Sequence, residues 1–164
     1  MEPTAIRRLR ALTATPEFSL TVFALLLNFP WEVAQAPMFE GMAAAPHSAV
    51  IRACSQATLG DAVILLLAHA SVVVVTRRRR WFLAPSWRDV AGFVAVGVGI
   101  TAMIEWLATR GHWVQTWAYS SAMPVIPGIG VGLLPLLQWV IVPPIVLWFA
   151  RRQAAHAGVG DDQT

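Results

Sequence analysis

Apolar residues are gathered into four long runs along the chain, and polar residues fall mostly between the runs. Crossing about 30 Å of hydrocarbon takes roughly 20 helical residues. The runs predict transmembrane helices over about residues 17–35, 58–76, 89–109 and 131–150. The first run is the least apolar, and Ser48–Gln56 can extend the second helix outward. The polar tail, residues 151–164, is expected to be loose.

The composition supports the same class of protein. The chain has 164 residues, of which 57% are apolar and 13% are charged. Soluble domains are typically about 25% charged. Disorder is excluded by the low charge and the aromatic content, and a collagen-like chain by the absence of a glycine period. We therefore expect a single domain over residues 1–164, an all-α polytopic membrane bundle of four transmembrane helices.

The basic residues indicate the orientation of this bundle. All twelve are arginines, and ten lie before the first predicted helix, between the second and third, or after the fourth. These ten are Arg7, Arg8, Arg10, Arg77, Arg78, Arg79, Arg80, Arg88, Arg151 and Arg152. The positive-inside rule then predicts a multi-pass protein of the inner (cytoplasmic) membrane with both termini cytoplasmic. Topology accounts for the arginine run, so we expect the lipid bilayer as partner and no nucleic acid.

The first apolar run also has an alternative interpretation as a cleaved signal peptide. Arg7–Arg10 can serve as the positive region, Phe18–Phe29 as the apolar region, and Ala34-Gln35-Ala36 as the cleavage site. Glu32 interrupts the approach to that site, and Pro37 would directly follow the cut. These two residues favour a retained helix.

Three carboxyl residues, Glu32, Asp61 and Glu105, lie inside the predicted helices. A charge at the bilayer centre costs at least about 2.5–3.5 kcal/mol, so acids within a membrane are functional candidates by default. In the predicted orientation the first and third helices run outward and the second runs inward. All three acids therefore reach the outer third of the membrane, and we take them as candidate catalytic residues.

Further polar residues are expected near these acids. Asn28, Glu32 and Gln35 share one face of the first helix because of their spacing. Candidate substrate-binding residues are Asn28, Gln35, Gln138, Tyr119 and Arg110. Arg110 and Arg52 are near enough in sequence to neutralise one or two of the acids. A buried polar network can also serve only to fix helix register, and this alternative stays open.

Other features of the sequence are less specific. No spacing typical of metal ligands or of a cofactor motif is present, and we expect neither a metal nor a cofactor. His69 lies deep in its helix and is expected to be a hydrogen-bonded core residue. Ala91, Ala95 and Gly99 form a row of small residues that lets another helix approach closely. We expect this row to pack inside the monomer rather than in a dimer.

Two resemblances to known families follow from these residues. The segment Asn28–Met38, with the pattern Asn-Phe-Pro-Trp-Glu-x-x-Gln-x-Pro-Met, resembles small uncharacterised bacterial membrane proteins with four helices. This resemblance extends through Gly60-Asp61 and the Pro135-x-x-Gln138-Trp139 stretch, and it implies no activity. A more limited similarity, to lycopene cyclases and bacterioruberin-type hydratases, rests on Glu105, Gly111, Trp117, Tyr119, Pro124, Pro127 and Pro135. It implies acid chemistry on isoprenoid double bonds without a redox cofactor.

Three functions are compatible with the sequence. The first is a non-enzymatic accessory or assembly-type membrane protein, whose partner is another membrane protein or a second copy of the chain. The alternative is an enzyme acting on a lipophilic, isoprenoid-like small molecule, with Glu105 and Glu32 as general acid and base. An oligomeric transporter is the least favoured, because four helices without a repeat form a transport path only through oligomerisation.

Overall fold

The computed structural model describes residues 15–161 and is all-α, with four long helices and three short 3-10 helices. The long helices are α2 (Pro16–Gln35), α3 (His47–Thr76), α4 (Trp87–Ala108) and α5 (Leu133–Asp161). The short ones are η1 (Ala36–Met38), η2 (Met42–Ala44) and η3 (Trp81–Leu83). The all-α prediction is confirmed.

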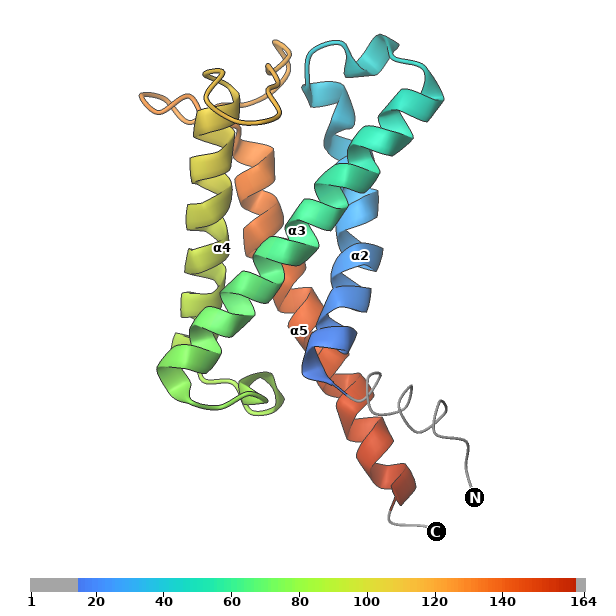
Figure 1. Ribbon diagram of the computed structural model, residues 1–164, viewed down its shortest axis with the longest axis vertical. Coiled ribbons are helices and arrows are strands. Elements are labelled where there is room, and N and C mark those ends of the chain that lie inside the picture. The colour runs from blue at the N-terminus through green and yellow to red at the C-terminus, as the bar shows by residue number, and fades with distance from the viewer. Residues whose placement is uncertain (1–14, 162–164) are drawn as a thin grey trace.

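The four long helices alternate in direction (Figure 1). The α2–α3 and α4–α5 connections lie at one end of the bundle, and the α3–α4 connection lies at the other. We name the first end the cap end and the second the terminal end, where α2 begins and α5 ends. Each of α2 and α4 packs against both α3 and α5, so the bundle is closed by contacts between neighbours around it.

Three of these helices are long and apolar enough to cross a membrane, namely His47–Thr76, Trp87–Ala108 and Leu133–Ala154. The predicted membrane class is supported to this extent. Within residues 15–161, α2 is not among these helices, because polar residues such as Asn28, Glu32 and Gln35 lower its mean hydropathy. The predicted cytoplasmic arginines Arg7, Arg8 and Arg10 lie outside the described residues.

The helix boundaries follow local sequence signals in two cases. The side-chain oxygen of Thr15 accepts the Phe18 N–H and caps α2. Ser86 and Asp89 form a reciprocal capping box at the start of α4. Both helices therefore begin and end close to the predicted residues.

The other two helices are longer than predicted. α3 begins at His47, so Ser48–Gln56 is indeed a helical extension of the second span. α5 continues to Asp161, and the prediction of a loose tail is wrong for residues 151–161. The alanines that follow Arg152 favour helix, and no proline interrupts them.

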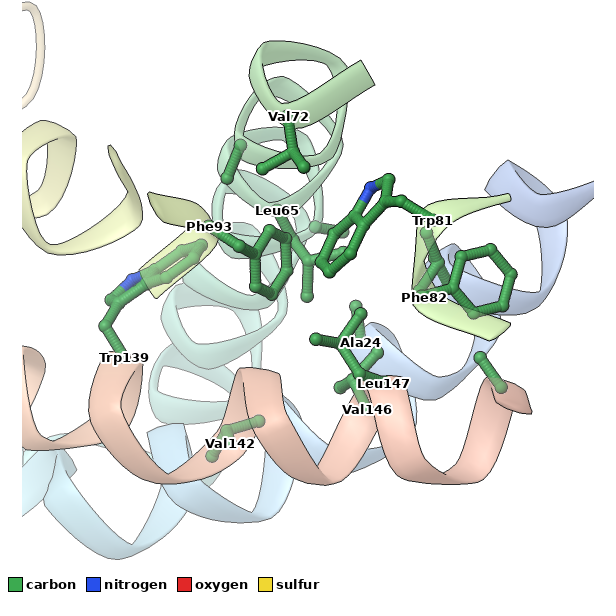
Figure 2. Close-up of a cluster of buried hydrophobic side chains, with 14 residues drawn as sticks. Ala24, Leu65, Val72, Trp81, Phe82, Phe93, Trp139, Val142, Val146 and Leu147 are labelled. Atoms are coloured by element: carbon green, nitrogen blue, oxygen red, sulfur yellow. The ribbon is translucent and has the colours of Figure 1, made fainter. Parts of the chain in front are cut away.

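The terminal half of the bundle has an apolar core built around Trp81 (Figure 2). This side chain comes from η3 and is fully buried, with its ring 5.5 Å from that of Phe93 of α4. Its indole nitrogen donates to Nδ1 of His69 at 3.1 Å. His69 is therefore the hydrogen-bonded core residue that the sequence indicates.

Helices α4 and α5 meet closely where Gly97 faces Trp139. A Cβ atom added to Gly97 would lie 1.9 Å from Cε3 of Trp139, so no side chain fits there. By contrast, Ala91, Ala95 and Gly99 are exposed. The expectation that this row packs inside the monomer is wrong, because the buried face of α4 is the one that carries Phe93 and Gly97.

Replacing Gly97 by alanine is expected to destabilise the bundle by about 1–3 kcal/mol, the usual cost of overpacking a tight core. The measurement is thermal unfolding of the purified protein in detergent. Gly99→Ala is the matched control, because nothing lies within 4 Å of a Cβ atom at Gly99. Equal stability of the two variants would contradict the described α4–α5 contact.

Candidate functional site

Four of the candidate residues form a hydrogen-bonded network around Gln138 of α5. Gln138 Nε2 donates to Asn28 Oδ1 at 2.8 Å and to Asp61 Oδ2 at 2.7 Å. Gln138 Oε1 accepts a hydrogen bond from Gln35 Nε2 at 3.4 Å. The single amide of Gln138 therefore joins α2, α3 and α5.

Glu32 lies within the same network. Its Oε1 accepts from Gln35 Nε2 at 2.8 Å, and the same Gln35 nitrogen donates to Gln138, which in turn donates to Asp61. Glu32 is buried and Asp61 is half-buried. The amides of Gln35 and Gln138 therefore place two carboxyl groups in one network inside the bundle.

Glu105 of α4 is held from the other side, by the α4–α5 connection. Its Oε2 accepts from Trp117 Nε1 at 3.0 Å and from the hydroxyl of Tyr119. The Tyr119 oxygen in turn accepts the backbone N–H of Gly132 at 2.9 Å. Burial, together with the hydrogen bond to the Glu105 carboxyl, raises the pKa of Tyr119 well above its usual value. Glu105 and Tyr119 thus fasten the connection to the bundle.

The two connections at the cap end are also joined to each other. Phe39 and Tyr119 form an isolated antiparallel bridge. It is made by hydrogen bonds from the Glu40 N–H to the Ala118 oxygen and from the Ser120 N–H to the Met38 oxygen, both at 2.9 Å. We name residues 36–46 and 109–132 together the cap. Because Tyr119 takes part in the bridge and also binds Glu105, the cap is anchored directly to the acid site.

The structure brings the three acids together, although in two groups. Glu105 is near enough to Glu32 and Asp61 to interact with them electrostatically. No hydrogen bond joins Glu105 to either of them in the part of the chain that the structure describes. The arrangement is therefore one network that holds Glu32 and Asp61, with Glu105 held separately by the α4–α5 connection.

Arg110 does not join the acids. Its Nη2 donates to the Ile129 carbonyl oxygen at 3.0 Å, and its guanidinium lies 4.5 Å from the centre of the Trp106 ring. The expectation that Arg110 or Arg52 neutralises an acid is wrong, since none of the ion pairs among residues 15–161 involves one of the three. Arg110 instead stabilises the cap. The Ile129 carbonyl oxygen and the Trp106 ring interact with its positive charge in place of a carboxylate.

Trp117 is a site residue that the sequence names only within the similarity to lycopene cyclases, without a role in the site. Its N–H reaches Glu105 because the α4–α5 connection folds back over the end of α4. The Trp117-x-Tyr119 spacing is the available signal, since alternate residues of an extended segment point to the same side. Trp117 and Tyr119 accordingly share one acceptor oxygen.

The described residues contain no metal-ligating cluster, and comparisons add no relative. Among residues 15–161, no group of three or more His, Cys, Asp or Glu side chains could hold a metal ion. The chain matches no protein-family model, no curated protein and no solved structure. The function of the site must therefore be argued from its own chemistry.

The single tyrosine of the chain gives a direct measure of the Glu105–Tyr119 contact. We expect tyrosinate absorbance of the folded protein to rise only well above pH 10, the usual tyrosine pKa, because burial and the neighbouring acid both disfavour the phenolate. After unfolding, the transition should fall near pH 10. Glu105→Gln should move the folded-state transition downward. A folded-state transition near pH 10 would contradict the contact.

Proposed function

We propose that the chain is a multi-pass protein of the inner membrane, with four spans and both termini in the cytoplasm. α2 is included because it is 20 residues long and packs along both α3 and α5, so it follows the same axis as the apolar helices. Arg77–Arg80 lie at the terminal end, and the positive-inside rule makes that end cytoplasmic. The cap end is then the outer end.

Reporter fusions test this topology. Fusions after Ala84 and Gly160 are expected to report a cytoplasmic location, and fusions after Ala45 and Ser120 an external one. Compartment-specific enzyme activity of the reporter is the measurement. A cytoplasmic signal at Ala45 or at Ser120 would contradict the four-span topology.

For the activity, the site favours acid–base chemistry on a lipophilic small molecule. The observation that carries this proposal is the burial of Glu32 and Asp61 in one amide network, with Glu105 buried at the same end of the bundle and no ion pair to any of the three among residues 15–161. An unneutralised buried acid is costly, so a proton held there is available for transfer rather than locked in an ion pair. The apolar helices around it suit a substrate that partitions into the bilayer.

The geometry distinguishes the roles of the acids. Glu105 binds Trp117 and Tyr119 of the α4–α5 connection through Oε2, whereas Glu32 and Asp61 are held by the amides of Gln35 and Gln138. We assign Glu105 as the acid that meets the substrate, because its other partners belong to the cap rather than to the amide network. Glu32 and Asp61 supply the base, and Asn28, Gln35 and Gln138 hold them in position.

A second candidate is the accessory or assembly-type membrane protein. It is favoured by the exposed row Ala91, Ala95 and Gly99, which leaves one face of α4 open to close helix packing. The polar cluster does not supply that contact, because Asn28, Glu32 and the other network residues face the interior. In this case the cluster fixes helix register, and the partner is another membrane protein or a second copy.

Isosteric variants separate the two candidates. Glu105→Gln and Glu32→Gln should each abolish a lipid or pigment change seen on deletion, with a fall in rate of about 10²–10⁴-fold, the usual contribution of a general acid or base. The measurement is mass spectrometry of extracted lipids from complemented deletion cells. Glu40→Gln, at an exposed acid of the cap, is the control and should complement fully.

Two other outcomes would contradict the enzymatic proposal. Loss of a co-purified membrane protein, with an unchanged lipid profile, would establish the accessory role instead. Full complementation by the Glu32→Gln/Glu105→Gln double variant would remove any chemical role of the acids.

A further inference from the structure

Two buried polar groups between α4 and α5 have no partner in the described part of the chain. They are Oγ1 of Thr101 and Nε1 of Trp139. The residues are 7% and 2% exposed, respectively. A buried donor without an acceptor is rare in folded proteins and calls for an explanation.

Thr101 differs from the other buried or half-buried threonines of the helices. Thr21, Thr58 and Thr76 each donate the hydroxyl to the carbonyl oxygen four residues earlier, at 2.7–2.8 Å. This bond is the usual way in which a threonine hydroxyl within an apolar helix finds a hydrogen-bond acceptor. Thr101 makes no such bond, so its hydroxyl group remains free to bind something else.

The positions of three neighbours indicate that the two groups lie at a similar level along the bundle. Gly97 lies against the six-membered ring of Trp139. Phe93 lies one turn from Gly97 toward the terminal end, and Figure 2 shows the Trp139 nitrogen on the side of the ring turned away from Phe93. Thr101 lies one turn from Gly97 in the opposite direction, about 6 Å along the axis. The N–H therefore points toward the level of Thr101.

We propose that Thr101 and Trp139 form a subsite that binds one uncharged oxygen atom, a hydroxyl or carbonyl, of a lipophilic molecule. An indole N–H can only donate, so the bound atom must be an acceptor. A threonine hydroxyl can donate to the same oxygen or accept from it. Gly97 and Val142, one turn from Thr101 and from Trp139 respectively, are apolar, which suits a neutral ligand with a hydrocarbon body.

The subsite adjoins the acid site. Thr101 and Glu105 are four residues apart on the buried face of α4, so they lie one above the other. A molecule anchored by its oxygen at Thr101 would extend its chain past Glu105. The role of the subsite as a substrate anchor rests on the proposed function, whereas the binding itself does not.

Ligand binding to the full-length protein in detergent tests the subsite. The probes are a long-chain primary alcohol and the alkane of the same length, and the readout is the shift in thermal unfolding as the probe is titrated. Wild type should bind the alcohol about tenfold more tightly than the alkane, the effect of about one net hydrogen bond. Thr101→Val, which removes only the hydroxyl, should lose this preference.

Thr58→Val is the matched control. Thr58 is equally buried, but its hydroxyl is already bound to the Cys54 carbonyl oxygen, so the alcohol preference should persist in that variant. Trp139→Phe removes the indole N–H and should lose the preference as Thr101→Val does. It serves as the second variant if Thr101→Val does not fold.

Equal binding of alcohol and alkane by wild type would overturn the proposal, and so would an equal loss in Thr58→Val and Thr101→Val. The outcome is separable from that of the proposed function. If the Glu32→Gln/Glu105→Gln double variant complements fully while wild type keeps its alcohol preference, the subsite stands and the chemistry fails. If the preference is absent while Glu105→Gln abolishes the lipid change, the chemistry stands and the subsite fails.

Discussion

The side-chain amide of Gln138 is the interaction on which the cap end of the bundle depends. No water is available within hydrocarbon, so each buried amide donor and acceptor has to be met by protein. Gln138 meets this constraint with Asn28 and Gln35 of α2 and with Asp61 of α3. The least apolar helix is thereby held to the bundle through its polar face. The same bonds fix the helix register that brings Glu32 and Asp61 into one hydrogen-bonded network.

The two ends of the bundle use different physical means. At the terminal end, Trp81 and Phe93 fill an apolar core. His69 is buried next to this core, where its Nδ1 accepts a hydrogen bond from the Trp81 indole N–H. At the cap end, polar groups face inward, and two connecting segments cover them through backbone pairing and the Glu105–Tyr119 contact. The polar site therefore lies between a rigid apolar base and a cap attached by a small number of hydrogen bonds.

Sequence periodicity predicts the parts of this structure that depend on local pattern. The helical spacing of Asn28, Glu32 and Gln35 is sufficient to predict a shared inward face, and alternating helix directions place Asp61 and Glu105 at the same level. Contacts made by connections are not predictable in this way. Arg110 hydrogen-bonds the Ile129 carbonyl oxygen, and Trp117 hydrogen-bonds Glu105. Both contacts arise because the α4–α5 connection folds back over the end of α4. The outward position of Ala95 depends on which face of α4 Trp139 occupies.

The burial of Trp81 has a consequence for biogenesis. This residue belongs to the connection between α3 and α4, yet its ring lies in a core that also contains Val146 and Leu147 of α5. The core around Trp81 is therefore incomplete until α5 has been synthesised. A nascent chain that ends after α4 leaves this indole without part of its packing. α5 thus encloses a residue that was translated well before it.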